Sequence, residues 1–206
     1  MPDTAYAHLL DCDPVLGAIV SEVGPLDHDG RRRGRPNDSY GALVRSIVGQ
    51  QLSVKAAATI YGRVTELYGG STPTPAQLIE TDPEDLRAAG LSYSKAAYLR
   101  DLAERIEDGD LDLAALPELP DKEVGEMLIQ VKGLGQWTVD MFLMFHLGRP
   151  DVLPVGDLGI RRAAEQAYGL RKLPSPERLK RLARPWRPHR TLACLYLWES
   201  LDNAPA

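Results

Sequence analysis

The sequence has few cysteines and no long apolar run, and these absences exclude several classes of protein. Cys12 and Cys194 are the only two cysteines in 206 residues, so neither a four-cysteine iron–sulfur cluster nor a cysteine-based zinc site can form. The longest apolar stretch, Met141–Leu147, contains His146 and is too short to cross a bilayer. The four histidines follow no metal-binding spacing. We therefore expect no catalytic metal and no membrane association.

The N-terminal residues lack the basic and apolar regions of a secretion signal. Asp3, Asp11 and Asp13 stand where a signal peptide has Lys or Arg ahead of an apolar run. Two distant cysteines also agree with a reducing compartment, in which both stay free thiols. The sequence therefore predicts a cytoplasmic protein.

Positive charge is scarce overall but concentrated in one segment. The chain has 24 Lys+Arg and 29 Asp+Glu, a net charge of −5. Residues 1–156 hold 14 basic and 24 acidic side chains, whereas residues 157–190 hold 10 basic and 3 acidic. Because physiological salt limits the reach of each charge to about 8 Å, a local basic segment can bind phosphates on an acidic protein. A solvated helix face explains the same charges equally well, so charge alone leaves nucleic-acid binding open.

Apolar residues recur at helical spacing along most of the chain, and no stretch alternates as a strand does. Capping and stop signals predict helices over 39–49, 53–68, 82–90, 94–108, 121–131, 138–147, 158–168, 175–183 and 191–201. The chain is therefore predicted to be all-α, with about ten short helices. The Arg31–Asn37 stretch, rich in Arg, Gly and Pro, is predicted to be a mobile loop.

A glycine-rich turn, Val131–Thr138, lies between two of these helices. Gly133 and Gly135 are predicted to adopt positive φ and to leave backbone N–H groups uncovered at the start of the next helix. Such a helix start binds anions, and a DNA phosphate fits without sequence readout. A plain helix–turn–helix corner explains the same residues. A dinucleotide-binding loop would need a third glycine at Thr138 and a strand before the turn.

Several segments together resemble a known family. Leu128–Thr138, followed by Pro154–Asp157, resembles the helix-hairpin-helix superfamily of DNA base-excision glycosylases. Three further segments resemble its 3-methyladenine DNA glycosylase II branch, namely Ser46–Ala57, Gly90–Ala96 and Trp186–Arg190. The resemblance runs from about residue 39 to residue 201, with the segments in the family's order and spacing.

The resemblance implies a fold of two helical lobes with a DNA-binding cleft between them. The central lobe would span about 40–148 and contain the hairpin 131–138. The second lobe would combine 1–39 with 149–206, and the two would form one catalytic unit over 1–206. Members with an extra N-terminal sheet domain are longer, so this chain is similar to a minimal version of the fold.

The activity implied by the resemblance is that of a monofunctional glycosylase. Such an enzyme flips an alkylated purine, of the 3-methyladenine or 7-methylguanine type, out of damaged double-stranded DNA and hydrolyses its N-glycosidic bond. Asp157 aligns with the family's catalytic aspartate, which stabilises oxocarbenium-like charge on the sugar. By its pattern alone, Asp157 is an N-cap of the helix that follows. Trp137 stands near the position of the lyase members' lysine, which implies that water attacks and no Schiff base forms.

The resemblance also assigns roles to residues around this acid. Trp137, Trp186 and, more loosely, Tyr40 are expected to line the base pocket. Gln51 is expected to fill the gap that a flipped nucleotide leaves, with Leu52 and Gln50 as alternatives. The residues expected to contact the DNA backbone are Gly133, Leu134, Gly135, Gln136, Thr138, Lys132, Arg187 and Arg190. A monovalent cation is implied near the hairpin, and no other cofactor.

Several of these residues can also be explained by a purely structural role. Trp137 could pack two helices together, Gln50 could cap a helix end, and Arg187 and Arg190 could pair with neighbouring acids. The alternatives to an alkylpurine glycosylase are a glycosylase for oxidised, deaminated or exocyclic-adduct bases, a non-catalytic DNA-binding module, and an unrelated helical interaction protein. We expect a monomer.

Overall fold

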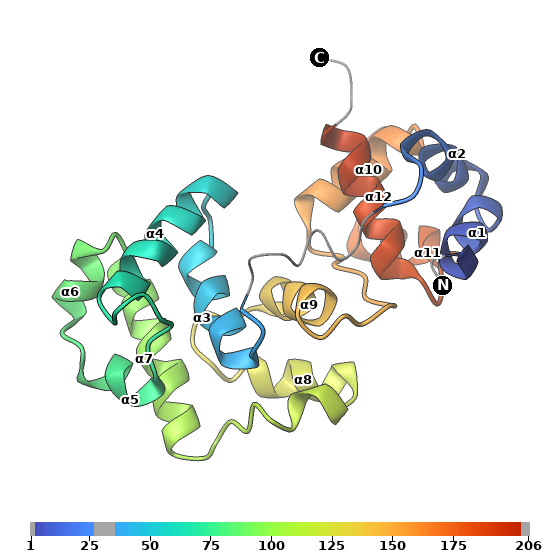
Figure 1. Ribbon diagram of the computed structural model, residues 1–206. Coiled ribbons are helices and arrows are strands. Elements are labelled where there is room, and N and C mark those ends of the chain that lie inside the picture. Colours follow the sequence, from blue (N-terminus) through green and yellow to red (C-terminus); the bar gives the residue numbers. More distant parts are fainter. Residues whose placement is uncertain (1–2, 27–35, 203–206) are drawn as a thin grey trace. The chain divides into compact units, whose positions relative to one another are not determined.

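The computed structural model describes residues 3–26 and 36–202, and within these ranges the chain is helical (Figure 1). The helices are α1 (Asp3–Asp11), α2 (Pro14–Val23), α3 (Ser39–Gly49), α4 (Val54–Glu66), α5 (Pro75–Glu80), α6 (Pro83–Ala88), α7 (Tyr93–Glu107), the 3₁₀ helix η2 (Leu116–Glu118), α8 (Asp121–Leu128), α9 (Gln136–Phe145), α10 (Leu158–Ala167), α11 (Pro176–Leu182) and α12 (Arg190–Asp202). The described ranges contain no strand, so the prediction of an all-α chain is confirmed. Most of the predicted Arg31–Asn37 loop lies outside these ranges.

Most helices begin where a short polar side chain accepts a hydrogen bond from the first turn. Ser53 caps α4, Asp82 caps α6 and Asp157 caps α10, as the sequence predicts. At α5, Thr74 and Gln77 form a reciprocal capping box. These bonds satisfy backbone N–H groups that have no partner inside the helix. Helix boundaries are therefore largely encoded by neighbouring residues.

Three α-helices and the 3₁₀ helix η2 were not predicted from the sequence, and one predicted helix begins two residues earlier than expected. The additional α-helices are α1, α2 and α5, of which α5 has only six residues. Both α2 and α5 carry proline in the first turn, where its missing N–H costs nothing. The helix predicted over 138–147 is α9, which begins two residues earlier, at Gln136. None of the described helices is both long enough and apolar enough to cross a membrane.

The chain divides into two compact units, and each is described here by itself. The terminal unit combines Met1–Arg33 with Leu143–Ala206, and the central unit is Gly34–Phe142. Both junctions lie six residues before the predicted lobe boundaries at 40 and 148. In the terminal unit, α12 packs against α2 and α10, and α1 packs against α2. Its core includes fully buried Leu16, Ile160 and Trp186.

In the central unit, α7 is the helix around which the others pack. It contacts α3, α5 and α6, and α3 in turn packs against α4. Leu99 and Leu102 of α7 have no exposed surface, nor has Ile47 of α3. The exposed surfaces of this unit include two short connections, one after α3 and one between α8 and α9. Both connections carry residues of the predicted site.

Candidate functional site

The hairpin Val131–Gly135 connects α8 to α9 and depends on one glycine for its shape. Gly133 has a φ of +81°, a conformation that side chains disfavour. A Cβ at this position would also overlap the ring of Tyr98 from α7. Gly133 is therefore required by both the backbone conformation and the available space.

Gly135 has a different role from the one predicted. Its φ is not positive, so the prediction that both glycines adopt positive φ is wrong for this residue. A Cβ on Gly135 would meet no atom within 4 Å. Among the described residues, the backbone N–H groups of Gly133, Gly135 and Gln136 have no acceptor. Gly135 thus leaves open space beside uncovered N–H groups at the start of α9, where the helix dipole favours an anion.

The other predicted backbone contacts around the hairpin divide into exposed and buried residues. Leu134 and Thr138 are each only 4% exposed, so their side chains anchor the hairpin rather than face solvent. The Lys132 side chain is exposed, and its Nζ lies 2.9 Å from Asp101 Oδ1. Gln136 is exposed and donates from Nε2 to Asp140 Oδ1 over 2.9 Å. The hairpin therefore presents mainly backbone and two polar side chains.

The second connection, the insertion turn Gln50–Leu52, joins α3 to α4. Gln51 has a φ of +58°, the only positive φ at a non-glycine residue in the described ranges, and its side chain is exposed. Leu52 is 38% exposed. The Gln50 side chain donates from Nε2 to the carbonyl oxygen of Gly133 over 2.8 Å. Gln51 and Leu52 thus remain candidates for insertion into DNA, whereas Gln50 is engaged in holding the hairpin.

Tyr40 lies in the first turn of α3, and its hydroxyl is buried without a hydrogen-bond partner among the described residues. Burial raises the pKa of this phenol well above its usual value, with smaller contributions from Tyr68, Asp38 and Glu107. These neighbours are not residues of the predicted site. Its predicted place in the base pocket stays a prediction.

Trp137 follows the hairpin on α9, and its indole is 45% exposed. Other large apolar side chains are at least as exposed, namely Leu67, Tyr93, Ile129 and Leu158, so exposure alone does not mark Trp137 as a base-binding residue. Its role in the base pocket stays a prediction.

In the terminal unit, Asp157 is held by two hydrogen bonds to one of its oxygens. Oδ1 accepts from the Ile160 backbone N–H at 2.8 Å and from Trp198 Nε1 at 3.1 Å. Asp157 therefore is the N-cap of α10 that its pattern predicts. The second bond fixes the direction of the carboxylate, and the residue remains partly exposed. A partly exposed negative charge held at a helix start is suited to stabilising positive charge on a ligand.

Trp198 of α12 contacts the candidate acid Asp157, and the sequence analysis did not identify it. Besides its bond to Asp157, its ring stacks on Phe145 with a centroid distance of 6.1 Å and an interplanar angle of 24°. Gly159 makes room for it, because a Cβ there would lie 3.0 Å from Trp198 Nε1. In the sequence, Trp198 is one apolar residue in a helical run, and no motif marks it.

Trp186 does not line a pocket, and that prediction is wrong. Its side chain has no exposed surface, and its Nε1 donates to Asp13 Oδ2 over 3.3 Å. The same oxygen accepts from the Tyr168 hydroxyl at 2.6 Å. An indole enclosed in this way cannot touch a base. The indole that lies beside the catalytic candidate is that of Trp198.

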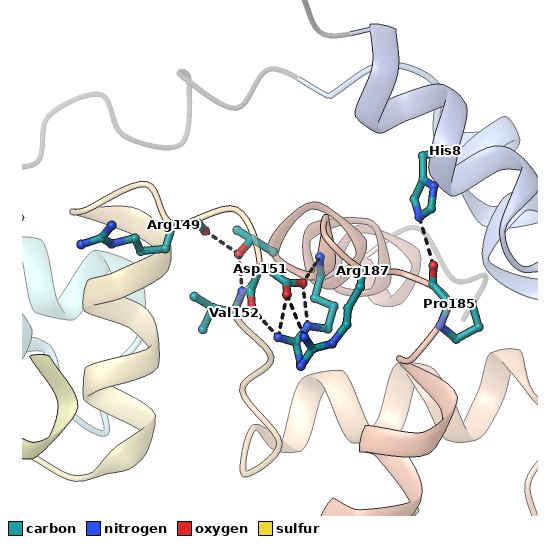
Figure 2. Close-up of polar contacts among 8 residues, drawn as sticks. His8, Arg149, Asp151, Val152, Pro185 and Arg187 are labelled. Atoms are coloured by element: carbon teal, nitrogen blue, oxygen red, sulfur yellow. Dashed lines mark hydrogen bonds and ion pairs between the residues drawn. The ribbon is translucent and has the colours of Figure 1, made fainter. Parts of the chain in front are cut away.

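Arg187 and Arg190 both approach Asp151. Figure 2 shows Arg187 beside Asp151. Arg190 donates from Nε to Asp151 Oδ1 at 2.6 Å and from Nη2 to Oδ2 at 2.9 Å, and its side chain is only 17% exposed. Arg187 is 62% exposed and lies 3.7 Å from Asp151 Oδ2. The predicted phosphate contact by Arg190 is therefore wrong, because its guanidinium is committed to a bidentate ion pair. Arg187 keeps an exposed guanidinium.

The chain is similar to known DNA repair proteins over nearly its full length. A family model described as HhH-GPD superfamily base excision DNA repair protein matches residues 44–188. DNA-3-methyladenine glycosylase 1 of Schizosaccharomyces pombe is 34% identical over 198 residues, covering 95% of this chain and 86% of the relative.

Two solved structures are also similar. DNA-3-methyladenine glycosidase from Bacillus halodurans has a TM-score of 0.83 and 39% identity, covering 98% of this chain and 91% of that chain. The Schizosaccharomyces pombe 3-methyladenine DNA glycosylase in complex with abasic-DNA has a TM-score of 0.86 and 33% identity, covering 97% of both chains. The resemblance inferred from the sequence motifs is therefore confirmed. The chain belongs to the HhH-GPD superfamily of base excision DNA repair proteins.

Proposed function

We propose that this protein removes alkylated purines, of the 3-methyladenine type, from damaged double-stranded DNA. The observation that carries the proposal is Asp157, held at the start of α10 by a backbone N–H and by the Trp198 indole N–H. Similar proteins named as 3-methyladenine glycosylases, matched over nearly the whole chain, support the same activity.

Asp157 stabilises the transition state of the hydrolysis. Cleavage of an N-glycosidic bond builds oxocarbenium-like positive charge on the sugar, and a fixed carboxylate lowers the energy of that charge. Because Ile160 N–H and Trp198 Nε1 hold the same oxygen, the carboxylate needs no reorientation during the reaction. Water forms a bond to the sugar C1′ as the C1′–N bond breaks. The electron pair of that bond stays with the cationic purine, which leaves as a neutral base, and the attacking water loses its proton to solvent. No Schiff base forms, because Trp137 occupies the position near which lyase members of the family place lysine.

Recognition of the base depends on aromatic surface. A purine alkylated at N3 or N7 is cationic, and an indole face attracts a cation by about 0.5–2 kcal/mol. Trp137 offers an exposed indole, and Trp198 offers a partly exposed one beside Asp157. Each indole, taken by itself, attracts a charged alkylated purine more strongly than the neutral parent base.

The hairpin and the insertion turn bind the DNA itself. Uncovered N–H groups at Gly133, Gly135 and Gln136 hold a backbone phosphate without reading sequence. Gln51 or Leu52 fills the gap that the flipped nucleotide leaves in the base stack. The monovalent cation implied near the hairpin would be held by backbone carbonyl oxygens, and that of Gly133 already accepts a bond from Gln50. The protein acts as a monomer.

The test compares wild-type protein with Asp157→Asn on duplexes that carry one 7-methylguanine or one 3-methyladenine. Asn keeps an oxygen for the N-cap and for Trp198 but removes the charge, so folding should persist. Base release should slow by about 10²–10³-fold. Asp82→Asn is the matched control, because Asp82 caps α6 with a bond to the Glu84 N–H at 2.9 Å.

Two outcomes contradict separate parts of the proposal. If wild-type protein releases neither base, the activity is wrong, and duplexes with oxidised, deaminated or exocyclic-adduct bases would identify the substrate class. If Asp157→Asn releases the base as fast as wild type does, the role of Asp157 is wrong. Strand nicking without added base would contradict the water mechanism.

A further inference from the structure

One face of α7 reaches both DNA-binding connections of the central unit. Lys95, Tyr98 and Asp101 are spaced three residues apart, so they follow one side of the helix. Lys95 contacts the insertion turn, whereas Tyr98 and Asp101 contact the hairpin. The segment Gly90–Ala96, which contains Lys95, contributed to the family resemblance, but no role was assigned to this lysine, and the proposed mechanism does not use it.

Lys95 holds the end of α3 immediately before Gln51. Its Nζ donates to the carbonyl oxygen of Val48 at 2.8 Å and to that of Gln50 at 2.7 Å. Val48 lies in the last turn of α3 and Gln50 is the C-cap that follows it, so neither carbonyl has a partner within the helix. Burial lowers the pKa of Lys95, since the ammonium is partly removed from water to reach these two oxygens.

The neighbouring Gln51 needs such support because of its backbone conformation. A φ of +58° is unfavourable for a residue with a side chain, and it persists only where surrounding contacts fix it. The Gln51 side chain itself is exposed, so burial does not hold it in place. The restraint therefore comes from the preceding residue, whose carbonyl is bound to Lys95 and whose side chain is bound to Gly133.

The hairpin is held by the next two turns of the same helix. Tyr98 packs against Gly133. Asp101, only 7% exposed, accepts from the Lys132 backbone N–H at 2.9 Å and from Arg105 Nε at 3.0 Å. Burial alone would raise the pKa of Asp101, but the hydrogen bonds from Lys132 and Arg105 outweigh it and hold the pKa below its usual value. Asp101 is thus a charged anchor for Lys132, the second residue of the hairpin.

We propose that Lys95 is a positioning residue that fixes the insertion turn relative to the phosphate-binding hairpin. The contacts form a closed path, from Lys95 to Gln50, from Gln50 to Gly133, and from Gly133 through Tyr98 back to α7. With this path intact, the inserted side chain enters the stack at a set distance from the bound phosphate, so that the turn need not be ordered on binding. This inference rests on the proposed function, because it requires nucleotide flipping.

The experiment compares Lys95→Met with the matched control Lys122→Met. Lys122 lies on α8 with its side chain 86% exposed, and its Nζ lies 3.4 Å from Glu126. Single-turnover base release is measured with the lesion correctly paired and with the lesion mismatched. We expect Lys95→Met to slow release from the paired duplex by about tenfold. Without Lys95, the inserted side chain is held less firmly, so the flipped nucleotide is aligned less well for the reaction. Release from the mismatched duplex should slow by less than about twofold, because flipping there costs least. Lys122→Met should match wild type on both.

A spectroscopic measurement tests the same step without turnover. 2-Aminopurine placed beside an abasic analogue brightens when its stack is disturbed, and Lys95→Met should reduce that increase while Lys122→Met should not. Lys95→Gln keeps one donor and should give an intermediate loss, and it replaces Lys95→Met if that variant does not fold.

The outcomes separate this inference from the proposed function. An equal loss on both duplexes, or no loss on either, overturns the positioning role. If wild-type protein releases no base, the proposed activity fails, and the 2-aminopurine signal still decides whether Lys95 positions the turn. An unchanged signal in the Lys95 variants overturns the inference in that case as well.

Discussion

The central unit and the terminal unit position their candidate functional residues by different means. In the central unit, the important features are backbone conformations, namely the positive φ of Gln51 and of Gly133 and the open backbone at Gly135. In the terminal unit, they are side chains, with the Asp157 carboxylate and the Trp198 indole bonded to each other. Mutations in the central unit should therefore act by changing the backbone shape, whereas mutations in the terminal unit should act by removing a side-chain group.

This difference follows from what each unit is proposed to bind. A DNA phosphate is the same at every nucleotide, so backbone N–H groups of fixed shape can recognise it without reading sequence. Bond cleavage instead requires one charge at one position, which only a side chain supplies. Substitutions that change shape should therefore act on DNA affinity, and substitutions that change charge or aromatic surface should act on the rate of release.

The largest expected effect separates the two tryptophans of the terminal unit. Trp186→Ala should lower the free energy of unfolding by about 3–5 kcal/mol, because it removes a fully buried indole. Trp198→Phe should lower it by only about 1 kcal/mol, through loss of the bond to Asp157. It should nevertheless slow base release by about tenfold, because the carboxylate loses its orientation. Urea denaturation and single-turnover assays check both. Normal release by Trp198→Phe would contradict its place in the site.

The two hairpin glycines should also differ, with Gly133 needed for stability and Gly135 needed for DNA binding. Gly133→Ala should destabilise the fold by about 2–4 kcal/mol, since the methyl group meets Tyr98 and the φ is unfavourable. Gly135→Ala should change the stability by less than about 0.5 kcal/mol. Its methyl group should still weaken binding to abasic duplex, because it occupies the space beside the uncovered N–H groups. Equal binding by wild type and Gly135→Ala, measured by fluorescence anisotropy, would contradict phosphate binding at this position.

A pH effect is expected in the central unit at Asp140. Burial raises its pKa from 3.8 to about 6, although the bond from Gln136 acts in the opposite direction. Because the folded pKa is the higher one, the protonated acid stabilises the fold below pH 4, and this contribution is lost as the pH rises through 6. The loss amounts to at most about 3 kcal/mol. Asp140→Asn should therefore gain stability relative to wild type between pH 4 and pH 8. A constant difference over that range would show that Asp140 ionises normally.

The smallest effects should separate the two arginines beside Asp151. Arg190→Ala should lower the stability by about 2 kcal/mol, because it leaves Asp151 without its bidentate partner. Arg187→Ala should change the stability by less than about 0.5 kcal/mol, since that side chain is mostly exposed. If Arg187 contacts a phosphate, its loss should reduce the salt dependence of DNA binding by about one charge. Titrations at several salt concentrations measure this slope for both variants.

Much of the site could be predicted because its local geometry depends on neighbouring residues. Asp157 caps α10 through a bond to Ile160, three residues away, and Ser53 caps α4 in the same way. The need for glycine at position 133 also follows from the hairpin itself. The two wrong predictions of residue roles have a common origin. Trp186 and Arg190 were given roles at the DNA, yet each is held by contacts with residues 39 or more positions away.

The sequence by itself determined the helical class, most of the helix starts, the hairpin and the acid at the N-terminus of α10. It could do so because hydrogen bonds within one turn are encoded by adjacent residues. Only the tertiary structure decided which indole lies beside that acid, which glutamine holds the hairpin and which lysine supports the insertion turn. Those contacts join residues 41, 83 and 45 positions apart. Packing of whole helices brings such residues together, and no local pattern in the chain specifies the pairing.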